Sequence, residues 1–456
     1  MKMKKSLFSE FDPISSKQWK QKIQFELKGD DYNDTLIWNS PENIKVKPFY
    51  DKDDLQNNLP VNPKTTGFKI CQNIFVFDLE KSIERALESI DRGAESIIFT
   101  IENEEIDVAK LLEKLPLETC EIYFNLNFIS VDYLSKIETI AKSRNAKIYC
   151  NLDPIGQLAK EGNWFKTEEK DNFETLNLIS KQVSQSSIIS INSALYQNAG
   201  ANRVQELAYS LAHANEYLNR ISTINQPIVF KISVGTNYFF EIAKLRAYRM
   251  LFDCIAKEYH PNLECHLVVT PSKRNKTIYD YNVNMLRTTT ECMSAIIGGA
   301  DAIANLPYDA LYYKDNEFGD RIARNQLLIL KNESYFDKVN NPADGTYYIE
   351  SISHQLAEKA LILFKDIEAN GGFLKQLKEG IIKRKIQESA DKEQELFDSG
   401  KEVLLGTNKY QNKDDKMKHD LELFPFVKVN PRKTLITPII EKRVAEKIEQ
   451  ERLGKE

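Results

Sequence analysis

The segment from Ile188 to Arg203 brings polar side chains to a place where a chain of this pattern could do chemistry. Ile188–Ile191 is rich in β-branched residues, which is typical of a buried parallel strand, and apolar residues at helical spacing resume at Val204. Asn192 to Ala199 is therefore predicted to be a loop at the carboxyl end of a strand, where α/β barrels place their active sites. It contains amides, hydroxyls and one phenol, but no His, Asp, Glu, Lys, Arg or Cys. General acid–base catalysis at neutral pH needs such a group, so the loop argues against it.

Two other patterns suggest a bound ion and are better explained structurally. Cys265 and His266 are neighbours in a predicted strand, so their side chains point to opposite faces and cannot both ligate one metal ion. Gly298-Gly299 precedes a strand instead of opening a helix, so we interpret it as a helix end and not as a phosphate loop. The sequence also has no G-x-S-x-G, Walker, G-x-G-x-x-G or H-E-x-x-H motif.

Eight short apolar runs alternate with amphipathic helical stretches between Cys71 and Leu330, and this alternation predicts the scaffold. About eight β-then-α units over roughly 260 residues match a (β/α)8 TIM barrel, which is an α/β fold. An open doubly wound sheet would give the same alternation, so the barrel prediction depends on the count. The predicted strands are Ile74–Phe77, Ser96–Ile101, Ile122–Asn127, Lys147–Leu152, Ile188–Asn192, Ile228–Val234, His266–Thr270 and Ala302–Asn305.

Two segments flank the predicted barrel at 62–332. Residues 1–61 hold many apolar side chains without periodicity, which favours an arm laid over the barrel or over a partner. Within this arm, Ser15 is expected to cap a short helix that Gly29 ends. Residues 333–456 are predicted to form a helical extension, with helices at Tyr347–Ala369, Leu374–Ser399 and about Ile439–Leu453.

The composition narrows the class of protein. Hydrophobic residues make up 42% and charged residues 28% of the chain, an ordinary balance for a soluble globular protein. The net charge of −5, without a basic stripe, argues against nucleic acid as a partner. The sequence has neither an apolar signal-peptide core nor a run of about 20 apolar residues that could span a membrane. The six cysteines form no C-x-x-C pair and most lie in apolar patterns, so we expect buried thiols in the reducing cytoplasm.

Several stretches resemble the barrel part of the methylmalonyl-CoA mutase family, and the resemblance covers nearly the whole chain. Trp38–Tyr50 is similar to the family's W-x-T-P-E-G-I-x-V-K-P-L-Y, and Gly200–Ala208 is similar to its A-G-A followed by Q-E-L-A. Phe240–Ala247 resembles F-x-E-I-A-K-L-R-A, and Asn341–Glu350 resembles D-P-x-x-G-S-Y-Y-V-E. The resemblance implies a TIM barrel with a role in isomerising methylmalonyl-CoA to succinyl-CoA, a radical rearrangement that uses adenosylcobalamin.

The departures from the family pattern fall where its catalytic residues lie. In catalytic chains the loop after the fifth strand reads Y-H-M-Q-E-A-G-A, and here Ala194 and Leu195 stand in place of the tyrosine and the catalytic histidine. Leucine can neither donate a hydrogen bond nor exchange a proton, so that role is lost. The loop after the eighth strand, S-L-H-x-N-x-x-D-E-A in catalytic chains, is replaced by residues 302–310. The resemblance therefore implies a vestigial pocket, matched to Ala194, Leu195, Gln197 and Asn305.

This pattern resembles the small, non-catalytic subunit of the heterodimeric mutase. The resemblance implies that a large catalytic subunit is the partner and binds adenosylcobalamin. It also implies that this chain holds no catalytic, cofactor-binding or metal-ligating residue and no flavodoxin-like cobalamin domain. The D-x-H-x-x-G pattern, by which many cobalamin-binding modules present a histidine, is indeed missing from the sequence.

Two alternatives remain open. One is a stand-alone barrel that binds acyl-CoA weakly and has a regulatory role. The other is an active barrel enzyme that pairs with a separate cobalamin-domain chain. An intact Y-H-x-Q-E loop would favour the active enzyme, so Ala194 and Leu195 count against it.

Overall fold

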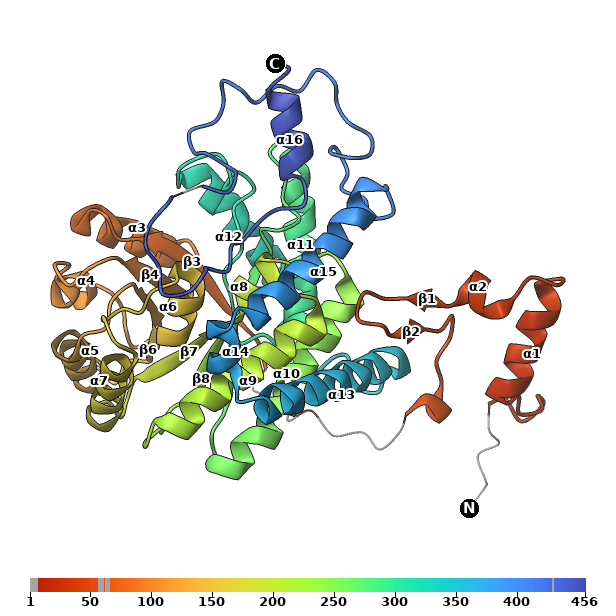
Figure 1. Cartoon of the computed structure of the whole chain (residues 1–456), viewed down its shortest axis with the longest axis horizontal. Coiled ribbons are helices and arrows are strands. Elements are labelled where there is room, and N and C mark those ends of the chain that lie inside the picture. Colours follow the sequence, from red (N-terminus) through yellow and green to blue (C-terminus); the bar gives the residue numbers. More distant parts are fainter. Residues whose placement is uncertain (1–6, 56–60, 62–65, 429) are drawn as a thin grey trace.

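Eight parallel strands form a closed barrel in the computed structural model, which describes all residues except 1–6, 56–60, 62–65 and 429. The strands follow one another around the barrel in the order β10-β3-β4-β5-β6-β7-β8-β9. Figure 1 labels β3, β4, β6, β7 and β8 of this barrel. This closure confirms the predicted TIM barrel against the open sheet. The strands are β3 (Lys69–Phe75), β4 (Ser96–Ile101), β5 (Glu121–Leu126), β6 (Ile148–Leu152), β7 (Ser187–Asn192), β8 (Ile228–Val234), β9 (Cys265–Pro271) and β10 (Ala302–Ile303).

The first barrel strand begins at Lys69 and not at Ile74, where the sequence placed it. Its first two residues pair with β10, and the residues from Cys71 onward pair with β4. Gln72 and Asn73 interrupt the apolar run, so the pattern of apolar residues does not indicate a strand before Ile74. The polar side chain of Gln72 is satisfied inside the barrel, because its Oε1 accepts a hydrogen bond of 2.8 Å from the guanidinium group of Arg324.

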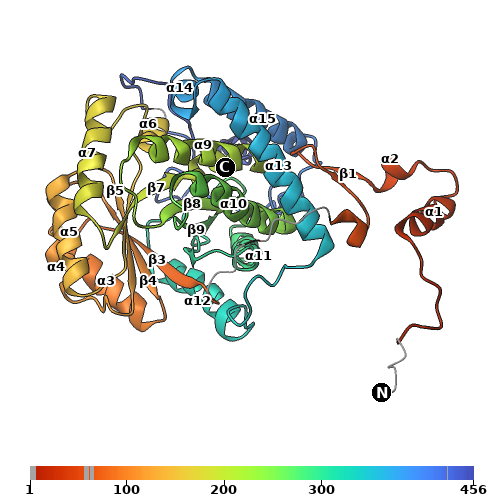
Figure 2. The same ribbon diagram turned by 90° about the horizontal axis from the view of Figure 1, so that it is seen from below.

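A ring of helices covers the outside of the barrel (Figure 2). Outward-facing strand residues such as Ile97, Phe124 and Phe230 are fully buried against the helices and form one continuous core with them. None of the helices in the described part of the chain is long and apolar enough to cross a membrane. The ring comprises α3 (Leu79–Asp91), α4 (Val108–Glu113), α5 (Val131–Ser143), α6 (Pro154–Glu161), α7 (Glu169–Gln182), α9 (Arg203–Arg220), α10 (Tyr238–Tyr259), α11 (Val283–Ile297) and α12 (Glu317–Asn332).

The C-terminal extension differs from its prediction in two places. The helix α13 (Tyr347–Ala369) has the predicted bounds and packs against α9 and α10. The single helix predicted at Leu374–Ser399 is instead α14 (Phe373–Lys378) and α15 (Ile381–Asp398), because Gly380 between them has φ +72°, a left-handed conformation. The last helix, α16 (Glu446–Leu453), begins later than predicted, because residues 434–445 have no helical hydrogen bonds and lie along the barrel.

The N-terminal arm projects from the body of the molecule (Figures 1 and 2). Ser15 caps its first helix with a capping box, as predicted. The Trp38 ring lies edge-on to Phe240 with centroids 5.6 Å apart, which fixes the base of the arm to α10, whereas no residue of α1 is buried. The predicted arm–barrel boundary adjoins residues 62–65, outside the described residues. The arm contains α1 (Ser16–Glu26), α2 (Tyr32–Leu36), β1 (Trp38–Asn39), β2 (Lys45–Val46) and a 3-10 helix at Lys52–Asp54.

Candidate functional site at the barrel mouth

The segment after β7 is a short helix, α8 (Ser193–Asn198), and not the loop that the sequence predicted. Its inner face is anchored in the barrel wall. Leu195 and Tyr196 are almost completely buried, and the Ser193 hydroxyl lies 2.6 Å from the hydroxyl of Ser210 on α9. Ala194 and Gln197 remain partly exposed on the other side. A helix of this length shows too few turns for apolar periodicity to reveal it.

The structure brings Leu195 and Gln197 to two different cavities. Leu195 lines a cavity of about 450 Å³ together with Ile439 of the C-terminal extension. Gln197 lines a second cavity of about 710 Å³ between the arm, α9 and α15. Its Oε1 accepts a hydrogen bond of 2.8 Å from the Ser272 hydroxyl in the loop after β9. These two residues of the predicted vestigial pocket therefore face apart.

Asn305 is held against α12 and away from either cavity. Its amide nitrogen donates hydrogen bonds of 2.9 Å to the carbonyl oxygen of Ala323 and to Oε1 of Gln326. The side chain is 6% exposed, and its donors are thereby satisfied within the barrel wall. Asn305 positions α12 in this structure.

A strap formed by residues 434–445 crosses the barrel mouth above α8 (Figure 1). Its backbone N–H groups donate hydrogen bonds to carbonyl oxygens in three places. These are the C-terminal end of α6, the last residue of α8 and the loop after β9. The strap is therefore joined to three of the segments that follow barrel strands, and it closes the mouth above Leu195. These bonds run from Leu435 to Gly162 (2.9 Å), Ile439 to Ala159 (2.8 Å), Lys442 to Asn198 (3.1 Å) and Val444 to Arg274 (3.1 Å).

Replacing Gly162 with alanine should release the strap. Gly162 has φ +76°, and a Cβ there would lie 2.5 Å from the carbonyl oxygen of Ile436. We expect the substitution to lower the free energy of unfolding by about 2 kcal/mol and to speed amide hydrogen exchange in residues 434–445. Gly345→Ala is the matched control, because Gly345 has φ +77° and nothing within 4 Å of its Cβ position. Equal effects of the two substitutions on strap exchange would contradict the strap contact.

A buried polar cluster ties α8 to the end of β6 behind the mouth. Nδ1 of His213 lies 2.8 Å from the Tyr196 hydroxyl, and its Nε2 lies 2.9 Å from Oδ1 of Asp153. Burial alone would raise the pKa of the Asp153 carboxyl, but His213 and hydrogen bonds from Tyr217 and a backbone amide hold this pKa below its ordinary value. His213 and Tyr196 are fully buried, so this cluster supports the wall and does not open to the mouth.

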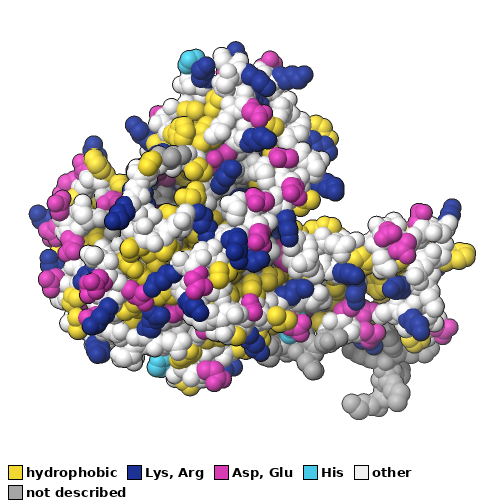
Figure 3. Space-filling view, in the orientation of Figure 1, with side chains coloured by type: hydrophobic (Ala, Val, Ile, Leu, Met, Phe, Trp, Pro, Cys, Tyr) yellow, Lys and Arg dark blue, Asp and Glu magenta, His cyan; other side chains and the backbone are white. Residues whose placement is uncertain are grey.

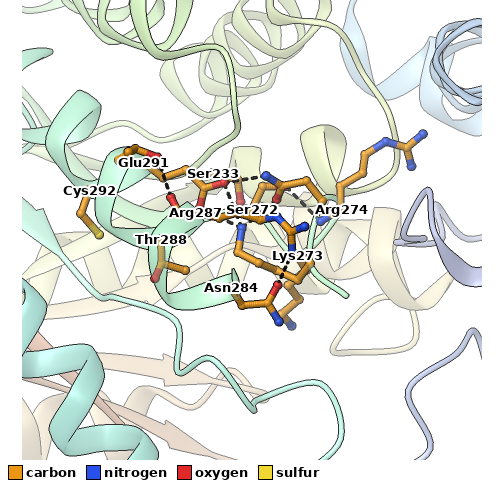
Figure 4. A network of polar contacts seen from close by, with 12 residues as sticks. Ser233, Ser272, Lys273, Arg274, Asn284, Arg287, Thr288, Glu291 and Cys292 are labelled. Atoms are coloured by element: carbon orange, nitrogen blue, oxygen red, sulfur yellow. Dashed lines mark hydrogen bonds and ion pairs between the residues drawn. The ribbon is translucent and has the colours of Figure 1, made fainter. Parts of the chain in front are cut away.

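A second buried cluster holds the loop after β9 against α11. Nζ of Lys276 donates to both carboxylate oxygens of Glu291, at 2.9 and 2.8 Å, and Asn275 donates to one of them at 2.6 Å. Figure 4 shows Glu291 on α11 and, near it, Arg287 and Ser272. Burial raises the pKa of Glu291 and lowers that of Lys276. Each group is the main partner of the other, so the pair has a structural role.

Aromatic side chains fill the middle of the barrel. Tyr149 of β6 stacks on Tyr123 of β5 and on His266 of β9, with centroid distances of 4.5 Å to each, and the Tyr123 and His266 centroids lie 5.8 Å apart. The Tyr123 hydroxyl lies 2.8 Å from Nε2 of His266, although β5 and β9 are not neighbours, so this contact crosses the barrel. Cys265 faces outward beside Arg249, which confirms the predicted opposite orientation of Cys265 and His266.

A cavity of about 780 Å³ lies at the amino ends of the strands, below this aromatic layer. Tyr149 and His266 line its inner end. Its other walls carry charges of both signs, including Lys147, Glu121 and Asp301. It lies at the end of the barrel opposite to the face where TIM barrels place their chemistry.

A polar layer lies above the aromatic layer, at the mouth. We call the five residues that form it the polar basin: Thr100, Asn125, Asn151, Asn192 and Lys231. Nζ of Lys231 donates to Oδ1 of Asn125 at 3.3 Å, and the amide of Asn151 donates to the same oxygen at 3.2 Å. The sequence analysis missed Lys231. A single lysine in the middle of the apolar strand Ile228–Val234 was the signal that could have found it.

A family model described as methylmalonyl-CoA mutase matches residues 101–450. The chain belongs to the methylmalonyl-CoA mutase family. This confirms the resemblance that the sequence motifs indicated, and at the level of the family it places the chain among isomerases.

Individual relatives agree with this assignment. The chain is 33% identical to the methylmalonyl-CoA mutase small subunit of Porphyromonas gingivalis, over 90% of this chain and 72% of that protein. It is 30% identical to the methylmalonyl-CoA mutase of Cereibacter sphaeroides, over 86% of this chain and 64% of that protein, so it spans less than two thirds of the second relative's length. A solved dihydropteroate synthase from Yersinia pestis covers 59% of this chain and 93% of its own, with 11% identity and a TM-score of 0.30. That likeness is too low to add to the fold described above.

The described mouth does not fit a corrinoid above α8. A corrin ring is a flat macrocycle, and it would need an open face over the barrel mouth. The strap instead hydrogen-bonds directly to α8 and to the loop after β9. Leu195 lies 1% exposed beneath the strap.

Proposed function

We propose that this chain is the non-catalytic small subunit of a heterodimeric methylmalonyl-CoA mutase. In this proposal the large subunit binds adenosylcobalamin and isomerises methylmalonyl-CoA to succinyl-CoA, and the chain described here stabilises it. The observation that carries the proposal is Leu195. In this proposal an aliphatic side chain occupies the position of the catalytic histidine, where it can neither donate a hydrogen bond nor transfer a proton, and it is almost completely buried.

The interior of the barrel supports the same proposal. A substrate held along the barrel axis needs an open passage, and the stacked rings of Tyr123, Tyr149 and His266 occupy that axis. The same layer argues against the alternative of a stand-alone acyl-CoA-binding barrel. Five of the six cysteines are buried and all six are free thiols, which supports a proposed location in the cytoplasm.

The direct test is to produce the chain alone and together with the large mutase subunit of the same organism. We expect the two chains to copurify with a mass equal to one copy of each. Isomerisation of methylmalonyl-CoA in the presence of adenosylcobalamin is expected from the pair and not from this chain alone. Turnover by the isolated chain would overturn the proposal, and so would failure of the two chains to associate.

The arm is the proposed contact with the large subunit. Its helix α1 has no buried residue, and Trp19 and Phe25 on it are 50% and 79% exposed. Figure 3 shows apolar side chains at the outer end of the arm, away from the barrel. Exposed aromatic side chains gathered on a projecting segment are typical of a surface that a partner covers.

Replacing both Trp19 and Phe25 with serine should weaken binding of the large subunit at least roughly tenfold, because aromatic anchors often contribute about 2 kcal/mol each. Titration calorimetry between the two purified chains measures the effect. Phe424→Ser is the control, because Phe424 is 58% exposed but lies in the C-terminal extension. Unchanged affinity in the arm variant would show that the arm does not carry the contact.

A further inference from the structure

The polar basin opens to solvent at the mouth, on the side of β3. Asn73 is exposed, and Phe75, which pairs in register with Thr100, is 46% exposed. Thr100, Asn125 and Asn192 are each partly exposed as well. These exposed side chains place the basin within reach of a small solute, and Tyr123, which is fully buried, lies beneath it.

Lys231 lies at the centre of this basin without a counter-ion. Lys231 of β8 pairs in register with Asn192 of β7. Its side chain reaches across the barrel and donates a hydrogen bond to Asn125 of β5. Among the described residues, no carboxylate lies within ion-pair distance of its Nζ. Lys231 is partly exposed, and its Nζ contacts the uncharged amide oxygen of Asn125, so the ammonium is left to pair with an added anion.

The nearest charged groups do not complete it. Asp153 acts on Lys231 from a distance, but its carboxylate already accepts hydrogen bonds from the Tyr217 hydroxyl at 2.7 Å and from the backbone of Asn192 at 2.7 Å. Lys160 on α6 repels the ammonium. Burial, the largest influence, and Lys160 lower the pKa of Lys231 below its ordinary value, although the charge of Asp153 acts in the opposite direction.

Two further groups that face the barrel interior have no partner within the described structure. Oδ1 of Asn151 is a buried acceptor, and the hydroxyl of Ser190 is a buried donor or acceptor. Asn151 is 5% exposed and Ser190 is fully buried, so leaving either one unpaired carries a cost. A ligand that completes the basin would bring a negative charge to Lys231 and an O–H donor to Asn151.

We propose that the polar basin binds a small oxyanion that also carries a hydroxyl group, either hydrogen phosphate or a short hydroxycarboxylate. The oxyanion pairs with the ammonium of Lys231, and the hydroxyl donates to Oδ1 of Asn151. This inference stands independently of the proposed subunit role, because it depends only on groups inside this barrel.

Nuclear magnetic resonance of the full chain, with its lysines reductively methylated with ¹³C, tests the proposal. The probes are phosphate and glycolate, with sulfate and acetate as matched anions that lack a hydroxyl donor. We expect phosphate or glycolate to shift the Lys231 signal and to raise its pKa, and which of the two does so identifies the source of the oxyanion. Sulfate and acetate should bind at least several-fold more weakly. No shift with any probe at tens of millimolar would overturn the proposal.

Two variants assign the contacts. Titration calorimetry with phosphate and glycolate measures the affinity of the variants, because Lys231→Met removes the NMR reporter. Lys231→Met should lose at least roughly tenfold in affinity, because the charge pair between its ammonium and the oxyanion is removed. Asn151→Ala should keep the anion but lose the preference for glycolate over acetate and for phosphate over sulfate. Lys257→Met, on the exposed face of α10, is the control and should bind like the original chain. Urea unfolding confirms that each variant is folded, and full affinity in Lys231→Met would contradict the assignment.

Discussion

Replacing Lys244 with methionine is expected to lower the free energy of unfolding by about 3 kcal/mol. Lys244 on α10 is completely buried, and its Nζ lies 2.8 Å from Oε2 of Glu206 and 2.7 Å from Oε2 of Glu241. It also donates to the carbonyl oxygen of Ser233 at 2.6 Å. Methionine fills a similar volume but leaves these oxygens without their donor in a site that water does not reach.

The expected loss is at the low end of the range for a broken buried ion pair, which is about 3–5 kcal/mol. Glu241 keeps a second partner, because Arg203 lies 2.8 Å from its Oε1. Glu206 can take up a proton when Lys244 is gone. The unpaired carbonyl of Ser233 and the newly protonated Glu206 therefore carry most of the cost.

Urea unfolding at neutral pH measures this effect. Lys257→Met is a matched control, because Lys257 lies on the same helix but is exposed, and it should change the free energy of unfolding by less than about 0.5 kcal/mol. If the two substitutions cost the same, the buried ion pair contributes no more than an exposed lysine does.

Replacing Glu206 with glutamine should change how stability depends on pH. Burial, offset in part by Lys244 and reinforced by Glu241, raises the pKa of Glu206 from 4.5 to about 7 in the folded chain. The folded chain therefore holds this proton more tightly than the unfolded chain does. Glu206 lowers stability progressively as pH rises from about 4.5 to about 7, and the penalty is complete above that range.

A pKa difference of this size corresponds to about 3 kcal/mol. Glutamine cannot ionise, so the free energy of unfolding of Glu206→Gln, relative to the original chain, should rise by about that amount between about pH 4.5 and about pH 8. Urea unfolding across this range measures the difference, and Glu258→Gln on the exposed face of α10 is the control. A difference that stays flat with pH would show that Glu206 ionises normally in the folded chain.

The opposite behaviour of Glu241 does not cancel this result. Burial would raise the pKa of Glu241, but the charges of Lys244 and Arg203 and their hydrogen bonds lower it below 4.5. The ionised Glu241 therefore stabilises the folded chain above about pH 4.5, and this stabilisation is lost as the pH falls below that value. Because Glu241 is present in both chains, most of its own titration cancels when the two pH profiles are subtracted, and the difference reports Glu206 together with its repulsion from Glu241.

The sequence by itself determined the scaffold. Apolar runs such as Ser96–Ile101 and Ile228–Val234 are strands with the predicted bounds, and Tyr347–Ala369 is a helix with the predicted bounds. These features were predictable because burial of a strand or of a helix face imposes a period on the residues of one segment. The motifs also identified the family, and they predict that Leu195, a residue that cannot transfer a proton, stands at the position of its catalytic histidine.

Only the tertiary structure decided which distant residues meet at the barrel mouth. Lys231 meets Asn125 across 106 residues of chain, and the backbone of Leu435 meets Gly162 from the far end of the sequence. The four residues matched to the vestigial pocket were named from their positions in motifs, and the structure places Leu195 and Gln197 at different cavities. Contacts of this kind leave no trace in local periodicity, because each residue needs only to suit its own strand or turn. The barrel brings such residues together only when it closes, and closure is a property of the whole chain.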